Sequence, residues 1–423
     1  MTISKLNLAA TIAAILLSTG VSAQSLDYQR KMTDAVNGRT FIAGADLSRY
    51  AWLNMETLFL QDTITRQGSA GNLPSDFHQE LDDFHFSTGR QTTTLYDHVM
   101  NSGLVDGIVI VQNGTVIYER YPHMKASDRH ALWSVSKVAL STALGVLEQQ
   151  GKLSLWAPID RYLPELEGTD WQGITVRDIA DMASGMDCRE VLADAFTNPE
   201  RCIFGYFAAL FNQEAPKQQA PHAYDIVRAV SKRQKPGQSY TYTSVNSFVL
   251  ARLVEELTDM PYADALSSLV WNRIGAEADA LVLVNKHGEP DAGGGISARL
   301  RDVARLGMAY LHTGPNANIL SQEWKDAIQE DARPDLMQNS PDGIALNLAA
   351  PHQAHHNARQ WDKVWLDGDH YKSGFSGQGL YVSPHRDLVI AWVGTHARDG
   401  HGTSLVRAAR ALAASDQFPA HQH

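Results

Sequence analysis

The sequence has 423 residues, of which 44% are hydrophobic and 20% charged, and its formal net charge is −11. This composition is typical of a soluble globular protein, and the length predicts two subdomains or one large domain with an insertion. The acidic balance argues against nucleic acid and anionic membranes as partners, because clustered Lys and Arg bind both.

Residues 1–23 have the pattern of a secretory signal peptide. Lys5 supplies a positive charge, residues 8–17 form an apolar stretch, and residues 21–23 provide a small-residue cleavage site. The apolar stretch is short for a membrane span, and no cysteine follows the cleavage site for lipid attachment. We therefore expect a mature chain that begins at Gln24, has no membrane span and is periplasmic or secreted.

Residues 24–95 carry no recognisable motif and are expected to form an N-terminal extension that wraps the body of the protein. A β-hairpin is predicted over 107–118, where two β-rich runs are joined by Asn-Gly, a pair that suits a type I′ turn. A helix that begins at Ser134 follows and is expected to end near Gln150.

Helix and loop patterns dominate from about 155 to 275, and strand patterns return towards the C-terminus. Helices are predicted at 175–182, 247–258, 300–311 and 405–414, and strands at 280–284, 363–366, 371–375, 379–382 and 388–393. This order predicts an α+β fold in which one antiparallel sheet is built from both chain ends and flanked by helices. The sheet subdomain would comprise 96–155 and 278–416, and a mostly helical subdomain would comprise 156–277.

Cys188 and Cys202 are the only two cysteines. In an oxidising compartment their proximity favours a local disulfide, worth about 3 kcal/mol for a loop of this size, with two separate thiols as the alternative. Histidines gather at 352–356 and at the C-terminus, in loop-like segments without a carboxylate at ligand spacing. Neither a metal nor another cofactor is therefore expected.

Ser134 and Lys137 are three residues apart and share one face of the predicted helix, with about 5–6 Å between their Cβ atoms. The lysine amine can therefore reach the serine hydroxyl and take its proton, which a serine nucleophile requires. At the helix start, free backbone N–H groups and the positive end of the dipole lie nearby. One Ser-x-x-Lys is a weak indication, since chance produces about one in a chain of this length.

Two later segments add polar groups that suit catalysis. Tyr242 and Ser244 lie just ahead of a predicted helix, and Lys372, Ser373 and Gly374 lie in a strand-like run. An exposed strand beside a nucleophile can hold an extended substrate by backbone hydrogen bonds, and a lysine there can pair with a carboxylate.

In this order the three segments resemble the motifs of the penicillin-recognising serine hydrolases. That superfamily includes class C β-lactamases, D-alanyl-D-alanine carboxypeptidases, esterases and 6-aminohexanoate-dimer hydrolases. The resemblance extends from about residue 105 to 395 and includes the flanking segments 174–178 and 293–298. It implies a β-lactamase/transpeptidase-like fold and an acyl-enzyme mechanism.

The resemblance also implies roles for individual residues. Ser134 matches the nucleophile, and Lys137 matches either the general base or the cation that lowers the pKa of a tyrosine. Tyr242 matches that tyrosine, which relays protons to the leaving group. The backbone N–H groups of Ser134 and Phe375 match the oxyanion hole. The residues matched to substrate binding are Ser244, Lys372, Ser373 and Gly374, with Lys372 and Ser373 at the substrate-carboxylate and strand positions.

The second motif reads Tyr-x-Ser where class C β-lactamases have Tyr-x-Asn, and Asn246 lies out of register. This variant is nearest to the esterase and 6-aminohexanoate-dimer hydrolase branch and predicts a small ester or amide substrate. Lys372 favours the alternative, a β-lactam or cell-wall peptide that bears a carboxylate. A catalytically silent binding protein with the same fold is an alternative of another class. The chain has no Gly-x-Ser-x-Gly segment, which argues against an α/β-hydrolase.

Overall fold

The computed structural model describes residues 26–191, 195, 197–211, 220–348, 353–396 and 404–420. The predicted signal peptide, residues 1–23, lies outside the described residues. Within the described ranges, no helix is both long and apolar enough to cross a membrane.

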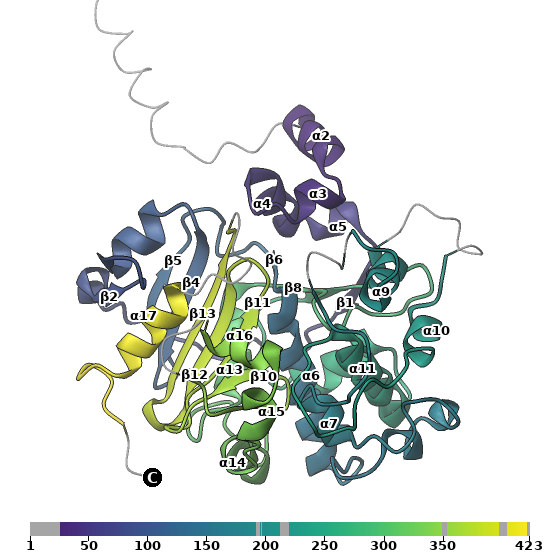
Figure 1. The fold of residues 1–423 in the computed structure, drawn as a ribbon. Coiled ribbons are helices and arrows are strands. Elements are labelled where there is room, and N and C mark those ends of the chain that lie inside the picture. The colour runs from purple at the N-terminus through teal and green to yellow at the C-terminus, as the bar shows by residue number, and fades with distance from the viewer. Residues whose placement is uncertain are drawn as a thin grey trace, which may run out of the picture.

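A seven-stranded antiparallel sheet in the order β5-β4-β13-β12-β11-β10-β9 forms one half of the molecule (Figure 1). Its strands are β4 (Val105–Gln112), β5 (Thr115–Arg120), β9 (His356–Ala358), β10 (Trp361–Val364), β11 (His370–Gly374), β12 (Gln378–Ser383) and β13 (Leu388–Gly394). Because β4 pairs with β13, the N-terminal hairpin joins the C-terminal strands within one sheet. The predicted sheet from both chain ends is therefore confirmed.

The hairpin between β4 and β5 turns at Asn113 and Gly114, whose φ angles are 49° and 71°. A type I′ turn needs a positive φ at both central residues, which Asn and Gly adopt at low cost. The hairpin predicted from this dipeptide is confirmed.

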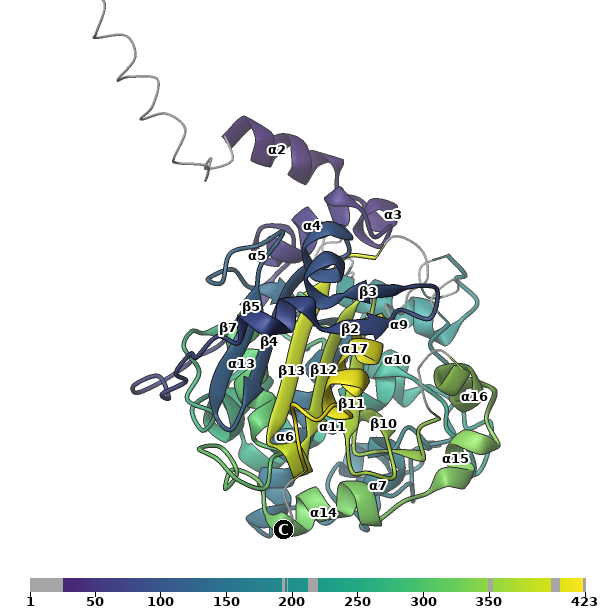
Figure 2. The same ribbon diagram turned by 90° about the vertical axis from the view of Figure 1, so that its left-hand side faces the viewer.

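Side-chain alternation along the strands buries both faces of the large sheet. On β4, Val109 and Val111 belong to the core that contains α6 (Ser136–Gln149) and α13 (Leu300–Met308). The neighbouring Ile108 and Ile110 belong to a second core, which α17 (Ser404–Ala413) covers from the other side (Figure 2).

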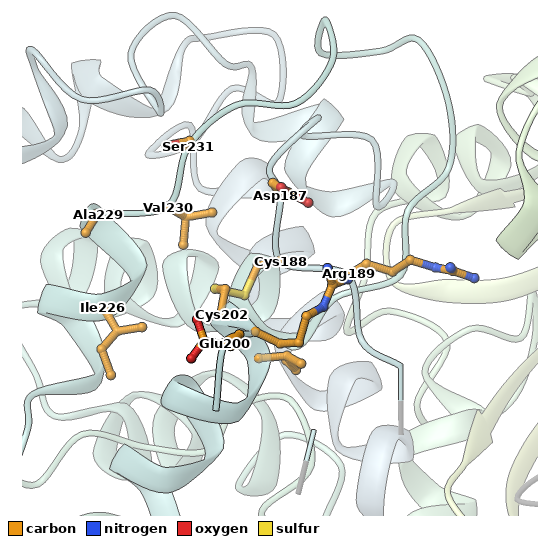
Figure 3. Close-up of a pocket in the computed structure, with 11 residues that line it drawn as sticks. Asp187, Cys188, Arg189, Glu200, Cys202, Ile226, Ala229, Val230 and Ser231 are labelled. Carbon is orange, nitrogen blue, oxygen red and sulfur yellow. A yellow bond between two sulfur atoms is a disulfide. The ribbon is translucent and has the colours of Figure 1, made fainter. Parts of the chain in front are cut away.

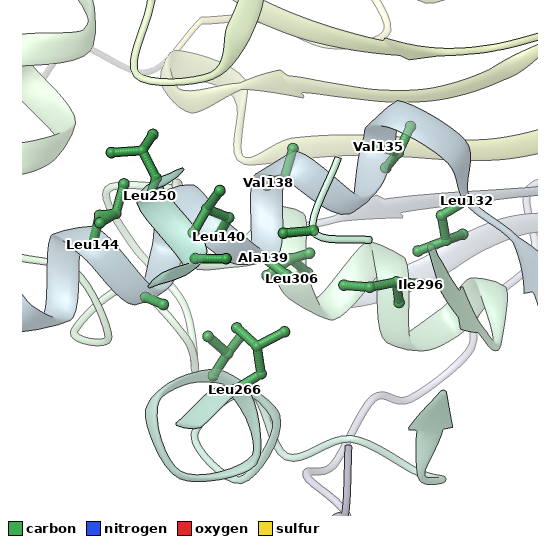
Figure 4. Close-up of a cluster of buried hydrophobic side chains, with 14 of the residues drawn as sticks. Leu132, Val135, Val138, Ala139, Leu140, Leu144, Leu250, Leu266, Ile296 and Leu306 are labelled. Atoms are coloured by element: carbon green, nitrogen blue, oxygen red, sulfur yellow. The ribbon is translucent and has the colours of Figure 1, made fainter. Parts of the chain in front are cut away.

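The central helix α6 is buried from Ser136 to Leu147. Figure 4 shows Leu140 and Leu144 of α6 facing Leu250 of α11 (Ser244–Thr258). The helix begins at Ser136 and not at Ser134 as predicted, because Trp133 has a left-handed φ of 48° and residues Trp133–Val135 form a separate 3₁₀ turn. Such a backbone costs a bulky residue on the order of 1 kcal/mol, so tertiary contacts must hold it.

Mostly helical elements occupy the side of the molecule beyond α6 (Figure 1). They are α7 (Val176–Ala180), α9 (Cys202–Phe211), α10 (Ala223–Arg228), α11 and α12 (Tyr262–Leu266). Three further helices follow α13, namely α14 (Gln322–Glu330), α15 (Pro334–Gln338) and α16 (Pro341–Leu348).

A second, four-stranded sheet has the order β1-β7-β8-β6. It consists of β1 (Gln61–Ile64), β7 (Ala280–Leu283), β8 (Ile296–Ala298) and β6 (His130–Ala131). The strand predicted at 280–284 therefore exists, but it pairs with the N-terminal extension through β1 and lies outside the large sheet.

The N-terminal extension contributes to both cores, although its sequence shows no motif. It contains α2 (Leu26–Ala35), α3 (Gly38–Phe41), α4 (Asp46–Leu53) and α5 (Met55–Leu58), followed by the hairpin β2 (His85–Ser87) and β3 (Thr92–Thr94). Phe41 and Trp52 are buried in the larger core, whereas α2 has no buried residue and projects from the body (Figures 1 and 2).

Candidate active site

A cleft of about 350 Å³ receives residues from all three sequence motifs. Ser134 comes from the turn before α6, Tyr242 and Ser244 from the start of α11, and Ser373 and Phe375 from β11 and the turn after it. Segments more than 100 residues apart in the sequence therefore meet in one cleft.

The Lys137 side chain is fully buried behind residues that line this cleft. Its Nζ donates to Ser134 Oγ at 3.2 Å, to Ser244 Oγ at 3.1 Å and to the Gly293 carbonyl at 2.6 Å. Burial lowers the pKa of Lys137 to about 8, while the Glu190 carboxylate acts in the opposite direction. A buried amine with this pKa and this contact can accept the proton of Ser134 near neutral pH.

Tyr242 lies between two lysine side chains. Lys137 Nζ is 5.0 Å and Lys372 Nζ is 4.8 Å from the centre of its ring, and Lys372 Nζ donates to the Tyr242 hydroxyl at 3.3 Å. Burial nevertheless raises the pKa of Tyr242 well above its usual range, and the carboxylates of Asp362 and Glu190 raise it further. A hydrogen bond with Ser134 acts in the opposite direction. The phenol therefore keeps its proton and is placed to donate it.

Close packing brings β11 against the turn that carries Ser134. A Cβ on Gly374 would lie 2.7 Å from the Leu132 carbonyl oxygen, so only glycine fits there without a backbone shift. The next residue, Phe375, stacks edge-on against Trp133 with ring centres 5.0 Å apart. This contact holds Phe375 beside the turn that carries Ser134. The backbone N–H groups of Ser134 and Phe375 stay the predicted donors of the oxyanion hole.

Aromatic residues of the N-terminal extension support the same turn. The Trp52 ring lies 5.5 Å from Trp133 and 6.0 Å from Phe375, and the Phe41 ring lies 5.6 Å from Trp133. Trp52 is fixed in turn, because its indole N–H donates to the Phe41 carbonyl at 3.0 Å. The extension thus packs behind the nucleophile and Phe375, a role that its sequence does not reveal.

Ser244 is held between Lys137 and a carboxylate that sequence reasoning missed. The Ser244 backbone N–H and hydroxyl both donate to Glu190 Oε2, at 3.0 and 2.6 Å. The Glu190 N–H donates to the Tyr242 carbonyl at 2.9 Å. Ser244, predicted to contact substrate, therefore connects Lys137 to Glu190. No local motif marks Glu190, which precedes Ser244 by 54 residues.

The glycine-rich segment 293–295 fixes the other partner of Lys137. The N–H groups of Gly293 and Gly294 both donate to Asp291 Oδ1 at 3.1 Å, and burial raises the pKa of Asp291 to about 6. A Cβ on Gly293 would lie 2.7 Å from the Ser244 Cβ. Glycine at this position therefore lets the segment approach α11 and present its carbonyl to Lys137.

Lys372 does not offer the free cation that the sequence suggested. Its Nζ lies 2.5 Å from Asp362 Oδ1 on the neighbouring strand β10. The N–H and hydroxyl of Ser373 donate to the other oxygen, Asp362 Oδ2, at 2.9 and 2.5 Å. Lys372 and Ser373, matched to the substrate-carboxylate and strand positions, are thus both bound by a carboxylate of the chain itself, because strand pairing aligns Asp362 with them.

The two cysteines form a disulfide between the segment before Glu190 and the first residue of α9. Figure 3 shows this disulfide beside a second cavity of about 270 Å³, with Arg189 directed away from it. Arg189 forms an ion pair with Asp342 at the rim of the first cleft. The disulfide therefore anchors the segment that carries Arg189 and Glu190.

Residues 93–415 match the family model described as Beta-lactamase. The 6-aminohexanoate-dimer hydrolase of Paenarthrobacter ureafaciens is 28% identical over 321 residues, which cover 73% of this chain and 78% of that protein.

Two solved structures share the fold at low identity. One from Bacillus anthracis, provisionally assigned as a 6-aminohexanoate-dimer hydrolase, has a TM-score of 0.71 at 20% identity, over 89% of this chain and 97% of its own. EstCE1, a hydrolase with promiscuous acyltransferase activity, has a TM-score of 0.55 at 15% identity, over 75% of this chain and 96% of its own.

Proposed function

Because the chain belongs to the beta-lactamase family of serine hydrolases, we propose that it hydrolyses a small ester or amide through an acyl-enzyme on Ser134. The observation that carries this proposal is the contact of 3.2 Å between Lys137 Nζ and Ser134 Oγ in a cleft that also contains Tyr242. A nucleophile, a base of suitable pKa and a proton donor are the groups that acyl transfer needs.

The first half of the reaction forms the acyl-enzyme. Ser134 Oγ attacks the substrate carbonyl carbon while neutral Lys137 accepts its proton. The N–H groups of Ser134 and Phe375 stabilise the oxyanion, an effect worth about 3 kcal/mol for each donor. Collapse of the tetrahedral intermediate breaks the bond to the leaving alcohol or amine, which receives a proton from Tyr242. Lys137 then returns a proton to Tyr242.

The second half consumes one water molecule. Water attacks the acyl carbon and gives one proton to Lys137, and the second tetrahedral intermediate releases the carboxylic acid. The proton on Lys137 returns to Ser134 Oγ, which restores the enzyme. The pKa of Lys137, lowered to about 8, and the raised pKa of Tyr242 support Lys137 rather than a tyrosinate as the base.

The substrate class rests on the second motif and on the relatives. The Tyr-x-Ser motif and the similarity to a 6-aminohexanoate-dimer hydrolase favour a small linear amide or ester. The alternative, a β-lactam or cell-wall peptide, depends on a cation at Lys372, whose charge is paired with Asp362. A catalytically silent protein would not need Ser134, Lys137 and Tyr242 together in one cleft.

Export to the periplasm or medium belongs to the same proposal. Residues 1–23 have the composition of a signal peptide, and the Cys188–Cys202 disulfide suits an oxidising compartment. N-terminal sequencing of the protein from its host should therefore read Gln24 first. A first residue within 1–23 would contradict this processing.

A pulse of p-nitrophenyl acetate followed by rapid acid quenching tests the chemistry. Intact-mass and peptide analysis should find one acetyl group, on Ser134, and the Ser134→Ala variant should lose both adduct and turnover. Ser154→Ala, which changes an exposed serine, is the matched control and should keep both. Labelling of another residue, or undiminished turnover by Ser134→Ala, would refute the mechanism.

A further inference from the structure

Asp362 occupies a position where a hydrolase of this kind would receive part of its substrate. Its side chain is 3% exposed and lines the cleft that contains Ser134. The pairing of β10 with β11 places Lys363 opposite Tyr371, and this register sets Asp362 beside Lys372 and Ser373. The carboxylate is therefore part of the wall of the cleft.

Both oxygens of Asp362 are bound by donors that suit a carboxylate ligand. Oδ1 lies 2.5 Å from Lys372 Nζ, and Oδ2 accepts from the N–H of Ser373 at 2.9 Å and from its hydroxyl at 2.5 Å. A lysine, a hydroxyl and a backbone N–H that converge in this way form a binding site for one carboxylate. In this chain the Asp362 carboxylate occupies that binding site.

The part of the cleft wall that the structure describes provides no second cation that could replace Lys372. Among the described residues that line it, the acidic ones are Glu190, Asp291, Asp342 and Asp362, and the basic one is Arg189. Arg189 is itself paired with Asp342. A substrate carboxylate near Ser373 would therefore face like charge, and no described residue that lines the cleft offers it an unpaired cation.

We propose that Asp362 is an internal substitute for a substrate carboxylate and selects substrates that are uncharged at this position. The inference rests on the proposed function for its kinetic consequence and narrows the substrate class to neutral esters and amides. Asp362→Asn keeps the shape of the side chain but removes its charge. Lys372 and Ser373 then become available to an external carboxylate.

A purely structural role for the ion pair between Asp362 and Lys372 predicts a different kinetic result. If Asp362 only holds Lys372 in place, its replacement should reduce the turnover of charged and neutral substrates by the same factor. If Asp362 selects substrates, its replacement should change the ratio of kcat/KM for the charged substrate to kcat/KM for the neutral one, and the neutral substrate should still be turned over measurably. The ratio of kcat/KM values for a matched substrate pair separates these roles.

The kinetic experiment compares p-nitrophenyl butyrate with mono-p-nitrophenyl succinate, which differ mainly by a terminal carboxylate. The natural chain should prefer the neutral ester by at least about tenfold, and Asp362→Asn should shift the ratio by at least about tenfold towards the charged ester. Equal turnover of the two esters by the natural chain, or an unchanged ratio in Asp362→Asn and Asp362→Ser, would overturn the proposal.

A binding experiment in the Ser134→Ala background does not depend on catalysis. Ligand-observed NMR in a mildly acidic buffer compares hippuramide with hippurate, and thermal melting verifies that each variant is folded. Hippuramide should bind in preference to hippurate in the Ser134→Ala variant. Adding Asp362→Asn should produce hippurate binding, and the further change Lys372→Met should abolish it. Hippurate binding as tight as hippuramide binding with Asp362 intact, or no gain on adding Asp362→Asn, would contradict the proposal. If the natural chain does not turn over esters, the proposed function is refuted, but this binding experiment still tests the role of Asp362.

Discussion

The pH dependence of acylation is a direct test of Lys137 as the base. Burial lowers the pKa of this lysine to about 8, and only its neutral form can take the proton of Ser134. The rate constant kcat/KM for a neutral ester should therefore rise with pH and level off above about 8. At two pH units below the pKa, about one hundredth of the lysine is neutral, so the rate should be about one hundredth of the plateau.

Glu190→Gln perturbs this profile in a known direction. The Glu190 carboxylate raises the pKa of Lys137, so its removal should lower that pKa and shift the rising limb to lower pH. Glutamine can still accept the hydrogen bonds that Ser244 donates, at 3.0 and 2.6 Å in the natural chain. Activity below the midpoint should then increase relative to the plateau.

The assay is stopped-flow release of p-nitrophenol under single-turnover conditions, which isolates acylation from deacylation. Asp291, with a pKa of about 6, titrates at lower pH and would give a separate inflection. The assignment of Lys137 as the base would be refuted if the acylation rate rose only near the ordinary pKa of a tyrosine, about 10. It would also be refuted if the rise moved to higher pH in Glu190→Gln.

Three further substitutions test how the fold supports the site. Gly374→Ala places a Cβ 2.7 Å from the backbone that precedes the nucleophile, so kcat should fall by about 100-fold with little change in KM, as measured on p-nitrophenyl acetate. Trp52→Ala removes the ring that packs on Trp133 and should lower the free energy of unfolding by about 3–5 kcal/mol and reduce kcat. A stability in urea equal to that of the natural chain would contradict this prediction. Cys188→Ser opens the disulfide loop, whose ends are 14 residues apart, and should lower the free energy of unfolding by about 3 kcal/mol and with it the Tm. Dithiothreitol should lower the Tm of the natural chain by a similar amount but should not change the Tm of the variant.

Local sequence patterns predicted much of the backbone, since they act over a few residues. The Asn-Gly pair at 113–114 specifies its turn because both residues tolerate a positive φ. Runs of apolar, β-forming residues predicted β4, β12 and β13, and the apolar run after Ser134 predicted α6. The order of the three motifs predicted which residues meet in the cleft, although it could not give their distances.

Contacts between distant segments that no motif marks were decided by the tertiary structure. An aspartate in a strand pattern looks like any polar position, so the pairing of Asp362 with Lys372 appears only when β10 and β11 are in register. Trp133 has a left-handed backbone where its ring packs against Trp52, and Glu190 reaches Ser244 through a loop without a motif. Short-range patterns determine local backbone conformation, whereas buried charge pairs depend on which chain segments the whole fold brings together.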